Sequence, residues 1–408
     1  MGQRLKYFES GQGLAWLLII TGALSLIVLI ILLVSSLIYR PPADTAALKY
    51  FDPGFLARAA RYNRISMIIS VSVRITTWLF MAAAVWAVWR YFSGAGHVRL
   101  YIAAGYIALF YILLNIIILP LSFYRGYVIE HRFGLSNQSL GMWFSDFAKE
   151  KAIDIVISAA AFTGLYALMT YFSRNWWLIA ASVMAVFIII GVYLFPVLID
   201  PLFYNFKKLE DQELRQDLLE VTGRAGIEVS DILIADASRK TVKANAYFTG
   251  FGNTRRIVLY DNLVNDFTRE ESINVVAHEA AHWRYLHIIK SIAIGISTGF
   301  LGLFLLSVIL RRTGLTGDLR AIFIIILLVS FITFLSAPPQ NILSRHFERQ
   351  ADRLALEITG GHEAQIGLMK SLAEANLANV DPHPIIRAVL YSHPPIIERI
   401  QAAEMQKP

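Results

Sequence analysis

The sequence predicts a mainly α-helical, polytopic membrane protein with a small β-sheet in a polar part of the chain. Of its 408 residues, 56% are hydrophobic and only 16% are charged, a balance too apolar for a soluble domain of this size. Seven apolar stretches approach or meet the length of about 20 residues that a membrane-spanning helix needs. Cysteine is absent, which excludes disulfides, a thiol nucleophile and metal sites built on thiolates.

The apolar stretches set the predicted spans. The first is longer than the roughly 7 to 15 residues of a signal-peptide core, so we expect it to be retained as a span. The last ends at Pro338-Pro339. The seven stretches lie near residues 15–39, 67–90, 101–124, 152–171, 176–200, 288–310 and 321–338.

Two long polar segments interrupt these spans and divide the chain into four parts. Because two spans separate the polar segments, both segments lie on one side of the membrane. No internal repeat is visible, which counts against a secondary transporter. The parts are residues 1–200 with five spans, 201–287 as the first polar segment, 288–338 with two spans, and 339–408 as the second polar segment.

The basic residues predict which side this is. The loops 40–66 and 125–151, which share the side of the polar segments, carry five and four Lys or Arg, whereas each opposite loop carries one to three. The positive-inside rule places the polar segments in the cytosol and the N-terminus outside. The net charge of +7 is spread beside the spans, a pattern that fits anionic lipid better than nucleic acid.

The first polar segment has the pattern of a globular domain. Residues 212–224 have helical spacing, and residues 232–235 form a short apolar strand. Residues 245–260 predict two strands around a Gly/Asn turn. Helices follow over 261–281, with Thr268 as an N-cap and Glu270 and Glu271 near the positive end of the helix dipole.

The strongest chemical motif is His278-Glu279-Ala280-Ala281-His282. Residues four apart share one face of a helix, so both imidazoles can reach one zinc ion while Glu279 addresses a water at that metal. The alternative is a pair of surface histidines beside a helix-stabilising glutamate.

A catalytic zinc needs a third protein ligand and one open position. Glu348 is the natural candidate if the two polar segments pack together, and Asp352, four residues on, can accept the N–H of a ligating imidazole. The alternative for this acidic pair is salt bridging on its own helix, with Arg345, Arg349 and Arg353. Rival ligands are His346, His362 and His383.

These residues predict hydrolysis of peptide bonds, with Glu279 as the general base. The oxyanion needs a further partner besides the metal, and His393, followed by two prolines, is one candidate. Arg399 could help through its charge or by orienting neighbours. The alternative is a rigid turn before a C-terminal helix. The strand from Asn245 to Phe251, with Tyr247, could bind an extended peptide along an exposed edge, unless it lies in the core.

In these motifs and spans the chain resembles the type I CAAX prenyl endopeptidases, membrane zinc metalloproteases (gluzincins) that are related to the HtpX heat-shock proteases. The resemblance implies seven helices that enclose a chamber, with one Zn²⁺ per chain bound by His278, His282 and Glu348. It also implies that Glu279 is catalytic and that Asn245 and His393 hold the peptide backbone and the reaction centre. The motifs that carry it are Glu130 to Gly134, Asn245 to Phe248, His278 to His282, Ser344 to Asp352 and Tyr391 to Arg399.

The resemblance implies substrates that are peptides or proteins, lipidated or membrane-associated, cleaved near a prenylated C-terminus. Ala280-Ala281 departs from the family pattern, in which a larger apolar residue precedes Gly, and predicts altered packing without loss of zinc. We expect a prokaryotic homologue in the cell membrane, or a protein of the endoplasmic reticulum membrane if the source is eukaryotic. The alternatives are quality-control proteolysis of membrane proteins, a transporter or channel with an incidental HEAAH, and a binding protein that has lost catalysis.

Overall fold

The computed structural model describes residues 12–39, 46–91, 98–250 and 255–406. In this part, six helices are long and apolar enough to span a membrane. Two further helices that are joined at a bend make a seventh span if they are counted together. The prediction of a helical, polytopic membrane protein is confirmed. The six helices are α2 (Gln12–Ile38), α3 (Pro53–Tyr91), α4 (Leu100–Phe123), α6 (Leu140–Tyr171), α7 (Trp176–Leu198) and α11 (His287–Arg312).

The bent pair consists of α12 (Leu319–Leu335) and α13 (Ala337–Thr359), which meet at 45°. The last apolar helix therefore ends three residues earlier than the sequence pattern predicts. Pro338 and Pro339 stand in the first turn of α13 instead of after a helix. A proline is tolerated there because the first N–H groups of a helix have no intrahelical acceptor.

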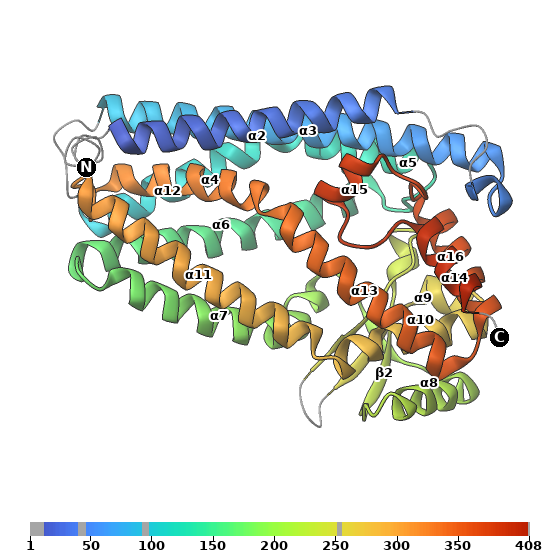
Figure 1. Ribbon diagram of the computed structural model, residues 1–408. Coiled ribbons are helices and arrows are strands. Elements are labelled where there is room, and N and C mark those ends of the chain that lie inside the picture. Colours follow the sequence, from blue (N-terminus) through green and yellow to red (C-terminus); the bar gives the residue numbers. More distant parts are fainter. Residues whose placement is uncertain (1–11, 40–45, 92–97, 251–254, 407–408) are drawn as a thin grey trace.

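The centre of the membrane part is α12. Its residues from Ala321 to Leu328 are all buried, and a helix that is apolar all round must be surrounded by other elements. It packs against α2, α3 and α6, while α7 lies along α11 (Figure 1).

A four-stranded sheet lies at one end of the long helices (Figure 1). Its order is β1-β2-β4-β3, with β2 and β4 parallel and the other two pairs antiparallel. The predicted strand pair and the strand at 232–235 are confirmed. The turn between β3 and β4, at residues 251–254, lies outside the described residues. The strands are β1 (Phe206–Lys208), β2 (Asp231–Ala235), β3 (Ala246–Thr249) and β4 (Arg256–Tyr260).

Helices cover this sheet and complete the polar domain. Leu218, Ile232, Leu259 and Val276 are fully buried between the strands and two of these helices. The helices predicted over 212–224 and 261–281 are confirmed. The helices of the domain are α8 (Gln212–Arg224), α9 (Asp261–Asp266), α10 (Arg269–Arg284), α14 (His362–Asn376), α15 (Pro384–Leu390) and α16 (Ile396–Met405). Short elements are η1 (Ala46–Lys49), η2 (Tyr124–Ile129), α5 (Glu130–Arg132), η3 (Asp200–Leu202) and η4 (Ala237–Arg239).

Two helices of the polar domain continue directly into membrane helices. α10 ends at Arg284, and α11 begins at His287 after a corner in which Leu286 has the left-handed φ of 56°. α13 follows α12 across a single residue, Ser336. α10 and α13 pack against each other, so the two helices that carry His278, His282 and Glu348 lie side by side in the polar domain (Figure 1).

Candidate metal centre

The predicted N-cap of α10 is present and starts the helix that carries His278 and His282. The Thr268 side chain accepts a hydrogen bond from the Glu271 N–H, and the Glu271 carboxylate accepts one from the Thr268 N–H. This capping box satisfies two N–H groups that the helix leaves without acceptors. Ala280 and Ala281 are fully buried, so the two small side chains let α10 approach its neighbours closely.

Three side chains from α10 and α13 form a group that could hold a metal ion, the one such group within the described residues: His278, His282 and Glu348. The Nε2 atoms of His278 and His282 are 3.2 Å apart. Glu348 Oε2 lies 3.3 Å from the first of them, and Oε1 lies 3.5 Å from the second. In a tetrahedral site with metal–ligand distances of about 2.1 Å, neighbouring ligand atoms are about 3.4 Å apart. The donor atoms therefore fit a tetrahedral ion such as zinc.

The electrostatics of the group also favour a cation. Burial alone would lower the pKa of His278, but the carboxylates of Asp352 and Glu348 raise it to about 10. Burial and the nearby His278 lower the pKa of His282 to about 3, so its ring is neutral, which is the form that binds metals. The cluster thus attracts one positive charge and offers a neutral imidazole beside it.

Asp352 lies behind His278. Its Oδ1 is 2.9 Å from His278 Nδ1, and Arg399 donates to both Asp352 oxygens, from Nε at 2.8 Å and from Nη2 at 2.5 Å. Burial raises the pKa of the Asp352 carboxyl, but Arg399 and His278 together hold it well below its usual range. The carboxylate therefore stays charged and fixes the orientation of the imidazole. The sequence left open whether Arg399 acts through its charge or by orienting neighbours. Its hydrogen bonds to Asp352 favour the orienting role.

Glu279 is partly buried and lies next to His278 on α10. Burial, then the charge of Glu348, raise its pKa to about 7, against the opposite effect of His278 and Arg399. A carboxyl group with a pKa near neutral pH can both take and return a proton.

His393 reaches the group from the loop between α15 and α16. Its Nε2 lies 3.4 Å from Glu348 Oε1, and its side chain is 59% exposed. Ser392 Oγ lies 2.9 Å from its Nδ1. Arg345 on α13 donates to the carbonyl oxygen of Tyr391, which anchors the loop.

The salt-bridge alternative required Glu348 to pair with arginines of its own helix, but Arg345 and Arg349 have other partners. Arg345 binds carbonyl oxygens, and Arg349 pairs with Glu398. The rival histidines lie elsewhere. His346 is exposed, His362 Nδ1 is 3.3 Å from the Ala403 carbonyl oxygen, and His383 caps α15.

Asn245 and Tyr247, the two predicted substrate-binding residues, lie at β3. Asn245 is exposed, and its carbonyl oxygen accepts a hydrogen bond from the Tyr260 N–H. The Tyr247 hydroxyl donates to Asp200 Oδ2 at 2.6 Å. β3 is an end strand of the sheet and packs against α10.

His287 is a site residue that the sequence did not reveal. The residue is 2% exposed, and its Nδ1 lies 3.1 Å from His282 Nδ1 while its Nε2 lies 3.0 Å from Gln350 Oε1. Its ring stacks on Phe347 with the centroids 4.2 Å apart. The only signal in the sequence was a histidine at the polar start of an apolar span, five residues after His282.

Comparisons with known proteins agree with this geometry. A family model described as CAAX prenyl protease N-terminal, five membrane helices, matches residues 56–205, and one for peptidase family M48 matches residues 208–407. The uncharacterized metalloprotease YhfN of Bacillus subtilis is 29% identical over 384 residues, which cover 90% of this chain and 88% of the relative. CAAX prenyl protease 1 of Saccharomyces cerevisiae is 29% identical over 311 residues, which cover 70% of this chain and 68% of the relative.

A solved structure shares the fold. The crystal structure of Ste24p from S. mikatae matches with a TM-score of 0.78 at 23% identity and covers 96% of this chain and 97% of its own. The two family models follow each other along the chain, and their matches run from residue 56 to residue 407 with a gap of two residues. The chain therefore belongs to the CAAX prenyl protease group of peptidase family M48 and is an integral-membrane metalloprotease.

Proposed function

We propose that the chain is a zinc-dependent endopeptidase in which His278, His282 and Glu348 hold the ion. The observation that carries this proposal is the spacing of their donor atoms, 3.2 to 3.5 Å, which suits a tetrahedral site with three protein ligands and one open position. Zinc bound there would polarise the scissile carbonyl and make water a stronger acid.

Glu279 acts as the general base. It takes the proton of the attacking water and later delivers it to the leaving amine, and the burial that raises its pKa favours its role in both transfers. His393 is the second catalytic residue. Its exposed imidazole beside Glu348 donates a hydrogen bond to the oxyanion that forms at the carbonyl carbon.

Asp352 and His287 position the two ligating imidazoles. Asp352 lies 2.9 Å from Nδ1 of His278, and His287 lies 3.1 Å from Nδ1 of His282. A hydrogen-bond partner at this nitrogen fixes the tautomer in which Nε2 is free to bind the metal. Arg399 keeps Asp352 ionised and in place.

The peptide binds along β3, where Asn245 and Tyr247 lie. An end strand offers N–H and C=O groups to an extended chain, and β3 packs against the helix that carries the two histidines.

We further propose that the polar domain faces the cytosol and that the substrates are lipidated or membrane-associated polypeptides. The distribution of Lys and Arg over the loops supports the cytosolic side, and the relative named CAAX prenyl protease 1 supports the substrate class.

The test combines metal analysis of the purified chain with cleavage of a farnesylated CAAX peptide and of its unprenylated counterpart. The expected result is about one zinc per chain and preferential cleavage of the farnesylated peptide. Glu279→Gln should retain zinc and lose about 10²- to 10⁴-fold in kcat. Glu357→Gln, an exposed glutamate on α13, is the matched control.

Two outcomes contradict parts of this proposal. A chain that takes up no zinc on reconstitution, or a Glu279→Gln variant with full activity, rules out the metal mechanism. Equal cleavage of both peptides leaves the peptidase mechanism intact but removes the preference for lipidated substrates, and it favours broader proteolysis of membrane proteins.

A further inference from the structure

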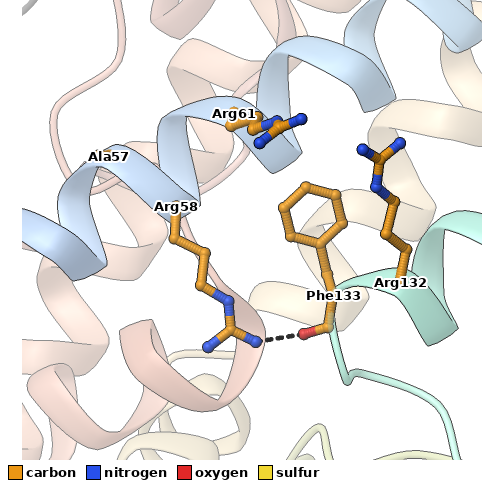
Figure 2. A pocket seen from close by; sticks show the side chains of 5 residues that line it. All are labelled: Ala57, Arg58, Arg61, Arg132 and Phe133. Carbon is orange, nitrogen blue, oxygen red and sulfur yellow. Dashed lines mark hydrogen bonds between the residues drawn. The ribbon is translucent and has the colours of Figure 1, made fainter.

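A small basic pocket lies outside the metal centre, at the start of α3. Its volume is about 320 Å³, and it is lined by Ala57, Arg58, Arg61, Arg132 and Phe133. The guanidinium groups of Arg61 and Arg132 lie on either side of the Phe133 ring, and Arg58 points to the Phe133 carbonyl oxygen (Figure 2).

The backbone at α5 shapes this pocket. The helix ends in a Schellman motif, in which the Leu135 N–H donates to the Glu130 carbonyl and the Gly134 N–H donates to the His131 carbonyl. Gly134 takes a φ of 69°, which glycine adopts without strain. The turn leaves the Phe133 carbonyl oxygen free to accept from Arg58, so the pocket has a fixed wall.

The charge of the pocket is not neutralised. No acidic side chain lines it, and none of its three arginines forms an ion pair with the described part of the chain. Glu130, two residues before Arg132, already binds the Tyr62 hydroxyl at 2.6 Å and Lys243 at 2.7 Å. Each guanidinium has five N–H donors, and Arg58 uses one nitrogen on the Phe133 carbonyl. Three like charges at one pocket therefore attract an anion.

The length of α3 carries the pocket beyond the apolar part of the helix. α3 has 39 residues and is about 58 Å long at 1.5 Å per residue, whereas the hydrocarbon core is about 30 Å thick. Its apolar stretch begins near residue 67, so Arg61 lies about 9 Å outside the hydrocarbon core along the helix axis. Asn63, two residues after Arg61, donates a hydrogen bond to the Leu377 carbonyl oxygen at 2.7 Å. This end of α3 therefore lies against the polar domain.

We propose that Arg58, Arg61 and Arg132 bind the phosphate group of an anionic membrane lipid. Arginine matches phosphate oxygens with paired N–H donors, and basic pockets at the ends of membrane helices suit lipid headgroups. The Phe133 ring and Ala57 give the glycerol side of the headgroup an apolar wall. Inorganic phosphate carries the same group and is the other source of such a ligand.

The experiment uses the full chain in detergent and native mass spectrometry of its lipid adducts. Dioleoylphosphatidic acid and dioleoylphosphatidylglycerol are titrated against dioleoylphosphatidylcholine, whose headgroup is zwitterionic. We expect tighter binding of the two anionic lipids. Arg61→Gln with Arg132→Gln should weaken that binding by about fivefold for each charge, or about 25-fold together.

Matched variants separate this effect from a loss of net charge or of folding. Arg215→Gln with Arg353→Gln removes the same charge from the polar domain and should leave lipid binding unchanged. Arg61→Lys with Arg132→Lys keeps the charge and should retain most of the anionic preference. Arg58 is left in place because its hydrogen bond to Phe133 gives it a structural role.

Two results overturn the proposal. One is an anionic preference that survives in the Arg61→Gln, Arg132→Gln chain. The other is that the native chain shows no preference for the anionic lipids over phosphatidylcholine, while millimolar phosphate raises the melting temperature of the native chain but not of that variant. The second result assigns the pocket to a free phosphate instead of a lipid.

Discussion

Asp352 contacts both His278 and Arg399. Replacing it with Asn therefore changes both metal binding and stability, each through a different partner. The side chains of Asp352 and Arg399 are only 13% and 9% exposed. In Asp352→Asn, an amide oxygen can still face His278, but an N–H₂ group must face the Arg399 guanidinium, where both partners are donors. We therefore expect both the zinc affinity and the free energy of unfolding to fall.

The two effects have different sizes. Loss of a carboxylate partner behind a ligating imidazole typically weakens metal binding by about 10- to 100-fold, or about 1.4 to 2.7 kcal/mol. Leaving Arg399 buried without its anion should cost the metal-free chain about 3 kcal/mol, the low end for breaking a buried pair, because one hydrogen bond remains possible. A competing chromophoric chelator measures the affinity, and equilibrium unfolding of the metal-free chain in SDS measures the stability.

A second substitution provides the control. Arg399→Met in the Asp352→Asn background removes the unpaired charge, so stability should return to within about 1 kcal/mol of the native value while zinc affinity stays low. The reasoning is refuted if Asp352→Asn binds zinc within about twofold of the native chain, or if the second substitution restores the affinity along with the stability.

Three further predictions concern the helices that carry the site. His287→Phe keeps the stacking on Phe347 but removes both ring nitrogens, so zinc affinity should fall about tenfold or more with the fold intact; unchanged affinity contradicts the positioning role. Thr268→Ala removes the cap of α10 and should lower the free energy of unfolding by about 1 kcal/mol, whereas Thr268→Ser should be nearly neutral in the same denaturation assay. Leu286→Gly relieves a left-handed backbone and should be neutral or stabilising by up to about 1 kcal/mol, while Leu286→Val should be clearly destabilising; the opposite order would show that the corner carries no strain.

The parts of the fold that follow from local chemistry could be predicted from the sequence. The lengths of the apolar stretches predict the spans, the Thr268 cap predicts the start of α10, and the four-residue spacing of His278 and His282 predicts that their rings meet. Glu348 could be chosen because a metal needs a third ligand and because Asp352 follows it at helical spacing. Each inference depends on residues that are close in the chain.

The parts that depend on distant contacts could not be predicted. The parallel pairing of β2 with β4 is set by how the sheet packs, which no short pattern records. Two proline residues look like the end of a span, yet the bend comes before them because a proline also suits a first helical turn. His287 resembles the polar flank of a membrane helix, and only the corner at Leu286 turns its ring back toward His282.

The join between α10 and α11 and the join between α12 and α13 have a consequence for how the enzyme is made. His278 and His282 come before a pair of membrane helices, and Glu348 comes after it. During synthesis, the two proposed histidine ligands are therefore made first, and Glu348 can join them only after both helices have inserted and the chain has returned to the same face of the bilayer. No continuous stretch of polar chain contains all three proposed ligands, so trimming either terminus cannot separate the candidate metal centre from the membrane helices.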